Sequence, residues 1–460
     1  MLTQSQAADI FAHIRKHSTA DEVEVLCYGG KSALTRFANN TIHQNVAEEN
    51  YGVSVRTVFG GRTARATTNK LDDESLKRVV RASESMAKVQ HPDSDLLPMA
   101  DQASGPLAST QASRYFDQTA AITPEQRAEK VKQIVAIAEK QKLTTAGIVS
   151  TSESVEGLFN SRGLARWHTQ TSSEISITML APDSSGWQKA NSPDIANLDA
   201  TALAETAARK ARESAGPQEI PAGKYTVILE PAAVLDMVGF MFFDFGGLAV
   251  LDQRSFLNNR VGTKLFGENI GIWDDVGHPL QSGAPFDGEG VSRQRVHLVE
   301  RGVVKQLVYA RASAEKMRHS EPKDQVGPIA ATGHGFPLPN EMGEAPMNIV
   351  FESPQNPQTV EQMMASTERG ILVTRLWYIR EVDPYEKILT GMTRDGTFLV
   401  ENGRIACGLR NFRFNESLIH MLSNVEAMGT PVRASGEESF DMVVPAMKVR
   451  EFNFTEVTKF

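Results

Sequence analysis

Cysteine is almost absent from this chain. Only Cys27 and Cys407 occur among 460 residues, and they lie far apart in the sequence. They match neither the close spacing of a metal or redox motif nor the dense pattern of a disulfide-stapled domain. We expect two reduced, buried thiols in a reducing compartment and regard a disulfide between them as the less favoured alternative.

Long apolar runs are missing as well. No stretch approaches the ~18 consecutive apolar residues of a transmembrane helix. The first seventeen residues, MLTQSQAADIFAHIRKH, lack the apolar core of a signal peptide. We therefore expect no membrane segment and a cytoplasmic location.

Basic residues are fewer than acidic residues in this chain. The chain has 48 Lys and Arg residues against 56 Asp and Glu residues, which gives a net charge of −8. Proteins that bind nucleic acid generally present a basic surface, so this balance argues against a nucleic-acid partner. The hydrophobic fraction of 41% and the charged fraction of 23% are typical of a globular protein.

The chain is organised around an apolar stretch near its middle. A β-rich run at 225–229 leads into Glu230-Pro231, and proline suits the first position of a helix. Residues 232–243 are apolar apart from Asp236, and Gly246-Gly247 follows. A helix that is apolar on nearly every side is usually buried on nearly every side. We expect a buried helix that is too short to span a membrane.

The first half of the chain mixes strand and helix patterns. Residues 22–30 alternate as a strand, and 35–69 predict a meander with turns at Asn39-Asn40 and Gly60-Gly61. Strands are also expected within 144–180. Helices are predicted at 4–17, 72–89, 123–142 and 198–214.

Two histidines lie four residues apart on the first predicted helix. His13 and His17 have a spacing that allows both to bind one metal ion from the same helix face. We expect no further Cys, Asp or Glu ligand to complete such a site. We expect an ordinary solvated helix face here.

These patterns predict an α+β fold with two domains. An α/β-layered N-terminal domain, residues 1–217, would combine a meandering antiparallel sheet with helices. Residues 122–217 could form a central subdomain within it. A mostly antiparallel β domain, residues 218–460, would surround the buried helix. The Pro/Gly-rich stretch 216–225 is typical of a linker between the two.

Several motifs along the chain resemble those of one protein family. The first, R-F-x-x-N-x-I-x-Q, comprises Arg36, Phe37, Asn40, Ile42 and Gln44. The second comprises Asp287, Gly288, Gly290, Arg295, Leu298, Glu300, Gly302 and Val303. The third is TRDGTFLVENGRI at 393–405. Together they resemble the TldD/PmbA family, also described as modulators of DNA gyrase, over nearly the whole chain.

The zinc motif of the TldD branch, His-Glu-x-x-x-His, is degenerate here. By resemblance, its three positions fall at Leu235, Asp236 and Phe240. Leucine and phenylalanine have no lone pair to give to zinc. The family's third ligand, a cysteine, would come from the stretch 427–439, which contains no Cys, His or Asp. The resemblance is therefore to the metal-free, PmbA/TldE-like branch.

This resemblance implies a function and a partner. A PmbA/TldE-like subunit would hold neither metal nor other cofactor, and zinc would be carried only by a TldD-like protease subunit. The two would form a hollow heterodimer that degrades unfolded or extended peptides. Dimerisation with a second copy of this chain stays open as an alternative.

Candidate peptide-binding residues cluster in the C-terminal half. Arg375, Trp377, Tyr378 and Arg380 lie on one expected strand, and aromatic and Arg side chains are enriched at binding hot spots. An extended peptide could bind there by strand addition. His334, flanked by two glycines, is a further candidate. The plainer interpretation is an ordinary polar strand and a loop histidine.

Two other classes of function remain open. One is a self-sufficient hydrolase that uses other residues, for example Asp244, His334 or Glu381. The other is a homodimeric peptide-binding protein without catalysis. No G-x-S-x-G elbow and no phosphate-binding glycine loop points to another chemistry.

Overall fold

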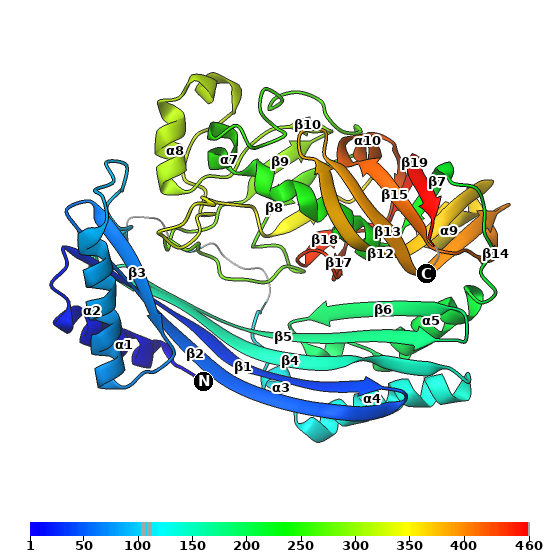
Figure 1. The fold of residues 1–460 in the computed structure, drawn as a ribbon, viewed down its shortest axis with the longest axis horizontal. Coiled ribbons are helices and arrows are strands. Elements are labelled where there is room, and N and C mark those ends of the chain that lie inside the picture. The colour runs from blue at the N-terminus through cyan, green and yellow to red at the C-terminus, as the bar shows by residue number, and fades with distance from the viewer. Residues whose placement is uncertain (103–106, 108–112, 459–460) are drawn as a thin grey trace.

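A long, curved antiparallel sheet dominates the first half of the chain in the computed structural model, which describes residues 1–102, 107 and 113–458 (Figure 1). Its strands follow the order β3-β2-β1-β4-β5-β6. They are β1 (Glu22–Ala38), β2 (Thr41–Phe59), β3 (Arg62–Thr68), β4 (Thr144–Asn160), β5 (Ala165–Leu180) and β6 (Ser185–Ser192). The two predicted hairpin turns are present, because Asn39-Asn40 and Gly60-Gly61 all have positive φ values.

Helices cover this sheet in two groups. The pair α1 (Gln4–His17) and α2 (Asp73–Val89) packs on β1 to β3 around one apolar cluster. The pair α4 (Pro124–Lys140) and α5 (Ala200–Glu213) packs under β4 to β6 around another. The short α3 (Asp117–Ala120) precedes α4, and η2 (Ile195–Asn197) lies between β6 and α5. Capping boxes at Thr3 and Thr123 satisfy the first backbone N–H groups of α1 and α4.

The buried central helix has the predicted position but a different form. After β7 (Gly223–Leu229), α6 (Pro231–Val238) gives way to the 3₁₀ helix η3 (Gly239–Phe245) and then to α7 (Gly247–Leu251). The sequence predicted one helix as far as residue 243. Glycine is a weak helix former, and 3₁₀ turns are frequent where an α-helix ends, so the change begins at Gly239.

Two sheets surround this helix. One has the order β12-β7-β19-β15-β13-β14, with β16 on β19; the other has the order β10-β9-β8-β11-β18-β17. The first contains β12 (Arg369–Asp383), β13 (Ile388–Glu401), β14 (Arg404–Gly408), β15 (Phe412–Ser417), β16 (Val425–Met428) and β19 (Met447–Val457). The second contains β8 (Ile272–Asp274), β9 (Val296–Glu300), β10 (Val303–Val304), β11 (Ile349–Phe351), β17 (Val432–Ala434) and β18 (Met442–Val444).

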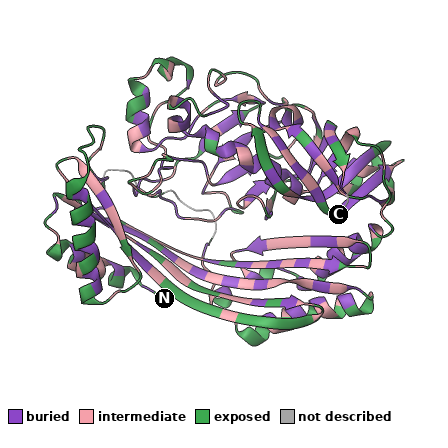
Figure 2. Cartoon of the chain, in the orientation of Figure 1, coloured by how far each residue is buried: buried purple, intermediate pink, exposed green. Residues whose placement is uncertain are grey.

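Short helices complete the second half, and its core is the larger of the two. These helices are α8 (Arg311–Arg318), η4 (Glu321–Gln325), α9 (Val360–Ala365) and α10 (Leu418–Ser423). Buried segments fill much of the second half (Figure 2), and its main apolar cluster includes residues of α6 and η3. The α+β fold class predicted from the sequence is confirmed. Most strand pairs are antiparallel, with β7 beside β12 and β11 beside β18 as parallel exceptions.

The two halves face each other across the sheet. The second half lies over one face of the curved sheet, and α4 and α5 lie on the opposite face (Figure 1). Lys210 on α5 reaches Glu230, the residue before α6, with a distance of 2.6 Å between Nζ and Oε2. Arg65 on β3 donates from Nε to the carbonyl of Leu338 at 2.6 Å. Among the described residues, no helix is long and apolar enough to cross a bilayer.

Candidate functional site

The degenerate motif lies at the centre of the second half. Leu235 and Asp236 on α6 have no exposed surface, and Phe240 on η3 packs against the same core while partly exposed. The apolar helix face predicted from the sequence explains this burial. Burial of a carboxyl group in such surroundings is costly unless it is hydrogen-bonded.

Asp236 receives its hydrogen bonds from the loop between β17 and β18. Its Oδ1 accepts from the backbone N–H groups of Glu437 and Glu438 at 3.1 and 3.0 Å. The loop comes this close because residue 436 is glycine. A Cβ atom there would lie 2.1 Å from Asp236 Oδ1. The stretch where the family's third ligand would be expected is thus joined to the motif helix through backbone amides.

The other oxygen of Asp236 has no hydrogen-bond partner. Oδ2 is buried and unpaired. Burial raises the pKa of Asp236 to about 7, because the two backbone amides only partly offset desolvation. The carboxyl group therefore changes its charge near neutral pH.

The side chains at this place do not fit a zinc ion. Leu235 and Phe240 offer no donor atom, which leaves Asp236 as the only motif position with oxygen ligands. Glu438 already binds other groups, since its Oε1 accepts from the Tyr378 N–H at 2.6 Å. Among the described residues, the group suited to hold a metal ion comprises His13, His17 and Asp73, in the other half of the chain.

Two of the predicted binding residues of β12, Tyr378 and Arg380, contact the same loop. Arg380 lies 3.6 Å from Glu438 Oε2, and its guanidinium lies over the Tyr378 ring at 4.5 Å. Tyr378 has a φ of 56° at a bulge, so its side chain turns out of the strand and is 53% exposed. These two side chains present an aromatic ring and a cation to solvent beside the loop.

Arg375 and Trp377 lie deeper. Arg375 is buried and donates from Nε to Asp395 Oδ2 at 2.9 Å. Its guanidinium lies 4.9 Å from the ring of Trp187 on β6 and 5.5 Å from that of Trp377. Trp377 is partly exposed and also lies under Arg394. Arg375 therefore links the two halves, and Trp377 lies beside two arginine side chains while part of it stays exposed.

His334 lies inside the protein, away from this strand cluster. Its Nε2 lies 3.0 Å from Asp274 Oδ1, and neither side chain has exposed surface. Its Nδ1 lies 2.9 Å from the hydroxyl of Thr332. The backbone N–H of Asn348 donates to the second oxygen of Asp274 at 2.8 Å. A buried, paired histidine of this kind joins β8 to its neighbouring loop and offers a peptide no contact surface.

Asp244 and Glu381 come together, but not with His334. Both lie 2.6 Å from the Nζ atom of the buried Lys387. Burial raises the pKa of Asp244, whereas the ammonium of Lys387 lowers it in part. Lys387 is also within 3.4 Å of the carbonyl of Phe240. An internal ion pair of this kind leaves neither acid free to act as a general base.

The sequence did not single out a polar row on the long sheet. Tyr28, Glu156 and His168 are direct cross-strand neighbours on β1, β4 and β5, so their side chains share one face. With Arg65 and Pro337 they line a cleft of about 440 Å³ between the halves. Burial raises the pKa of Glu156, although its side chain reaches solvent, and lowers that of His168. Only the strand register brings these residues together.

Family models match three consecutive parts of the chain. The PmbA/TldA metallopeptidase domain 1 matches residues 23–87, and the PmbA/TldA metallopeptidase central domain matches 117–215. The PmbA/TldA metallopeptidase C-terminal domain matches 222–456, which is half of the chain.

Comparisons with individual proteins point to the same family as these models. The chain is 23% identical to the metalloprotease PmbA of Escherichia coli O157:H7 over 94% of this chain and 92% of that protein. It is 24% identical to an uncharacterized protein of Methanocaldococcus jannaschii over 56% of this chain, but the match spans only 60% of that protein. The crystal structure of TldE from Thermococcus kodakarensis superposes with a TM-score of 0.84 at 19% identity, covering 97% of this chain and 99% of that one. At this identity the structural likeness concerns the fold.

Proposed function

This chain belongs to the PmbA/TldD metallopeptidase family, and from that membership we propose that it is a metal-free member that binds extended peptides beside a zinc-bearing, TldD-like subunit. The observation that carries the proposal is the environment of Asp236. Its Oδ1 binds the amides of Glu437 and Glu438, and the two remaining motif positions are apolar.

The donor chemistry supports the metal-free assignment. A catalytic zinc needs three protein ligands of N, S or O type and an open position for water. Leu235 and Phe240 supply none, and Asp236 is turned toward the loop amides. The carboxyl group of Asp236 therefore stays buried with one unpaired oxygen, without the two histidines that a zinc motif would place at positions 235 and 240.

Two surfaces support peptide binding. Tyr378 and Arg380 border the loop at 436–438, and Trp377 precedes them on β12; their aromatic rings and cation could hold a peptide backbone and its side chains. The cleft lined by Tyr28, Glu156 and His168 lies between the halves and offers both a carboxyl and an imidazole group. A peptide substrate fits both surfaces better than a nucleic acid, given the net charge of −8.

The partner follows from the missing ligands. A subunit without zinc needs another that carries it if the pair is to hydrolyse peptide bonds. The resemblance of the sequence to the PmbA/TldE-like branch implies a TldD-like partner. A second copy of this chain would make a binding protein without catalysis, which would stay inactive after co-expression with a TldD-like protein.

The test measures metal content and peptidase activity of the purified chain, alone and after co-expression with a TldD-like protein. We expect no hydrolysis of an unfolded protein substrate by the lone chain, no bound zinc that Asp236→Asn removes, and activity in a complex with the partner. Trp377→Ala in this chain should weaken peptide binding by the complex, while His319→Gln, on the exposed end of α8, should not. Stoichiometric zinc that is lost in Asp236→Asn, or metal-independent hydrolysis by the lone chain, would overturn the proposal.

A further inference from the structure

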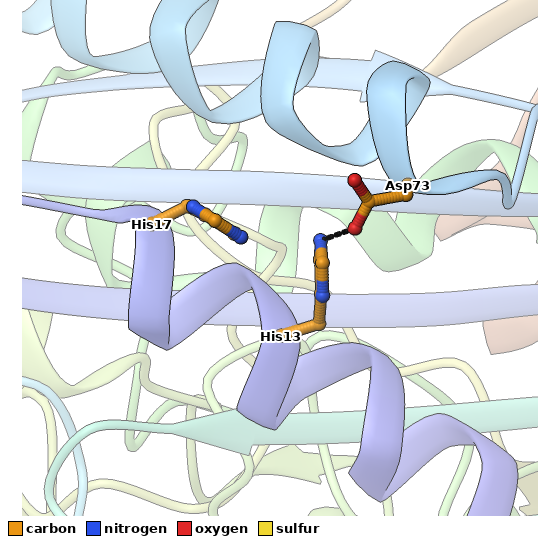
Figure 3. A group of neighbouring side chains, drawn as sticks. All are labelled: His13, His17 and Asp73. Carbon is orange, nitrogen blue, oxygen red and sulfur yellow. Dashed lines mark ion pairs between the residues drawn. The ribbon is translucent and has the colours of Figure 1, made fainter.

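A second place in the molecule has the ligands that the motif helix lacks. His13 and His17 project from α1 toward Asp73 on α2, on the outer side of the first half (Figure 3). The sequence predicted a plain solvated face. The packing of α2 beside α1 places Asp73 next to the two histidines.

The three side chains already have the geometry of a chelating group. His13 Nε2 lies 2.6 Å from Asp73 Oδ1. The two imidazole rings, four residues apart and therefore on the same helix face, have centroids 4.6 Å apart. One ligand atom from each of the three residues lies within 4.8 Å of the others. An ion between them would need only small side-chain rotations.

We propose that His13, His17 and Asp73 bind one late first-row transition-metal ion, such as Zn²⁺ or Ni²⁺. Two imidazoles and one carboxylate are ligands that these ions prefer, and a fourth position would be left for water. The ion would join α1 to α2 and so tie the first helix of the chain to the sheet. This site is independent of the degenerate motif and of the proposed peptide function.

The Nε2 atom of His13 is available to a metal ion. His13 Nε2 is close to Asp73, yet it makes no hydrogen bond of acceptable geometry. The side chains of His13 and Asp73 are 28% and 53% exposed, while the Nε2 atom of His13 is itself covered.

Lys77 is the main competitor for the site. Its Nζ lies 2.5 Å from Asp73 Oδ2 and 3.1 Å from Glu74 Oε1. It therefore contacts the oxygen of Asp73 that does not face His13. Exposed ion pairs contribute little, so the ammonium can stay on Glu74 while Asp73 turns to the ion. Removal of Lys77 should strengthen metal binding rather than weaken it.

The experiment titrates the full chain, stripped with a chelator, with ZnCl₂ and with NiCl₂ in a calorimeter. We expect one bound ion per chain and a higher unfolding temperature when the ion is present. In His17→Gln and in Asp73→Asn the affinity for the ion should fall by about tenfold or more. Lys77→Met should retain or strengthen binding. His319→Gln is the matched control, since His319 and Glu315 form a similar exposed pair without a third ligand.

A second measurement needs no variant. In the wild-type chain with labelled histidines, paramagnetic Ni²⁺ should broaden the ring signals of His13 and His17 before those of the other histidines. Equal broadening of all histidines, a bound ion that both ligand substitutions leave unchanged, or no saturable binding of either metal would overturn the proposal. None of these outcomes depends on peptidase activity or on a partner subunit.

Discussion

Asp236 shows how one buried side chain combines structure with sensitivity to pH. Its carboxyl group is surrounded by apolar residues and held by two loop amides, with one oxygen unpaired. Proteins normally pair buried polar atoms, so this exception has a measurable consequence. The folded chain favours the protonated acid more strongly than the unfolded chain does.

Replacement of Asp236 by Asn should remove a pH dependence of stability. The pKa rises from 3.8 to about 7 on folding, so between these values the folded chain holds a proton that the unfolded chain has released. Stability therefore falls as pH rises through this window, by at most about 4 kcal/mol, given ~1.4 kcal/mol per pKa unit. Urea unfolding of the wild-type chain and of Asp236→Asn at pH 4.5 and pH 8 measures this change in stability. A wild-type chain and Asp236→Asn with the same pH profile would contradict the assignment.

Loss of the Lys387 side chain should strongly lower the free energy of unfolding. Lys387 is buried between Asp244 and Glu381, and its Nζ lies 2.6 Å from each carboxylate. Lys387→Met would leave Asp244 buried without a counter-charge, which typically costs about 3–5 kcal/mol. Chemical denaturation checks this, with Lys305→Met, in an exposed pair with Glu300, as the control that should change little. Equal effects of the two substitutions would mean that the buried network is not structural.

At the scale of elements, α6 and η3 pack closely against the loop between β17 and β18. Two glycines permit this packing. A Cβ on Gly239 would lie 1.9 Å from Ser439 Oγ, and one on Gly436 would lie 2.1 Å from Asp236 Oδ1. On the outer side of the loop, Lys189 on β6 donates to the carbonyl of Gly436 at 3.0 Å. The loop is thus held from the helix and from the long sheet.

Gly436→Ala should displace this loop. The added methyl group would overlap Asp236, and overpacking of this kind costs about 1–3 kcal/mol. Glu437→Ala is the control in the same loop, because its exposed side chain has only a 3.5 Å contact with Lys189 and its backbone N–H is kept. Thermal unfolding should separate the two variants. If Gly436→Ala is as stable as Glu437→Ala, the contact between loop and helix is looser than the geometry indicates.

At the scale of the whole molecule, charged contacts join the two halves. Lys210 on α5 is buried, and its Nζ contacts Glu230, the carbonyl of Trp187 and the amide oxygen of Gln188. Arg375 approaches Trp187 from the other half, and Ser185 donates to Asp395 at 2.6 Å. The orientation of the second half over the sheet rests on such contacts, and the cleft between the halves depends on it.

Lys210→Met should weaken this connection. Glu230 would lose its partner at the start of α6, with a cost of about 3 kcal/mol if the pair behaves as a buried one. We expect faster hydrogen exchange in α5 and α6 and a separation of the unfolding of the two halves. Arg209→Met, on the same helix in an exposed pair with Glu213, is the control. Unchanged exchange at α6 in Lys210→Met would show that other contacts hold the halves.

Much of the fold could be predicted from local patterns. The hairpin turns at Asn39-Asn40 and Gly60-Gly61 and the capped helix after Thr123 follow from residue preferences that need no distant contact. The apolar run after Pro231 predicted a buried helix, although its 3₁₀ half was missed. Of the two cysteines, both free, Cys27 is buried as expected, whereas Cys407 is only partly so.

The candidate site could be predicted only in part. Among the residues identified from the sequence, Asp236 and Tyr378 both contact the loop at 437–438. The burial of His334 beside Asp274 was not foreseen, because its glycine-flanked sequence is typical of an exposed loop. The row of Tyr28, Glu156 and His168 depends on strand register, which no local pattern specifies.

The sequence by itself determined which chemical groups are available. It established the family resemblance, the loss of two imidazoles at Leu235 and Phe240, and the acidic balance of charge, because these are properties of residue identity. The tertiary structure decided which groups meet. Asp236 binds the loop at 437–438, Lys387 joins two acids, and Asp73 faces His13, since all three contacts join segments that only folding brings within a few ångströms.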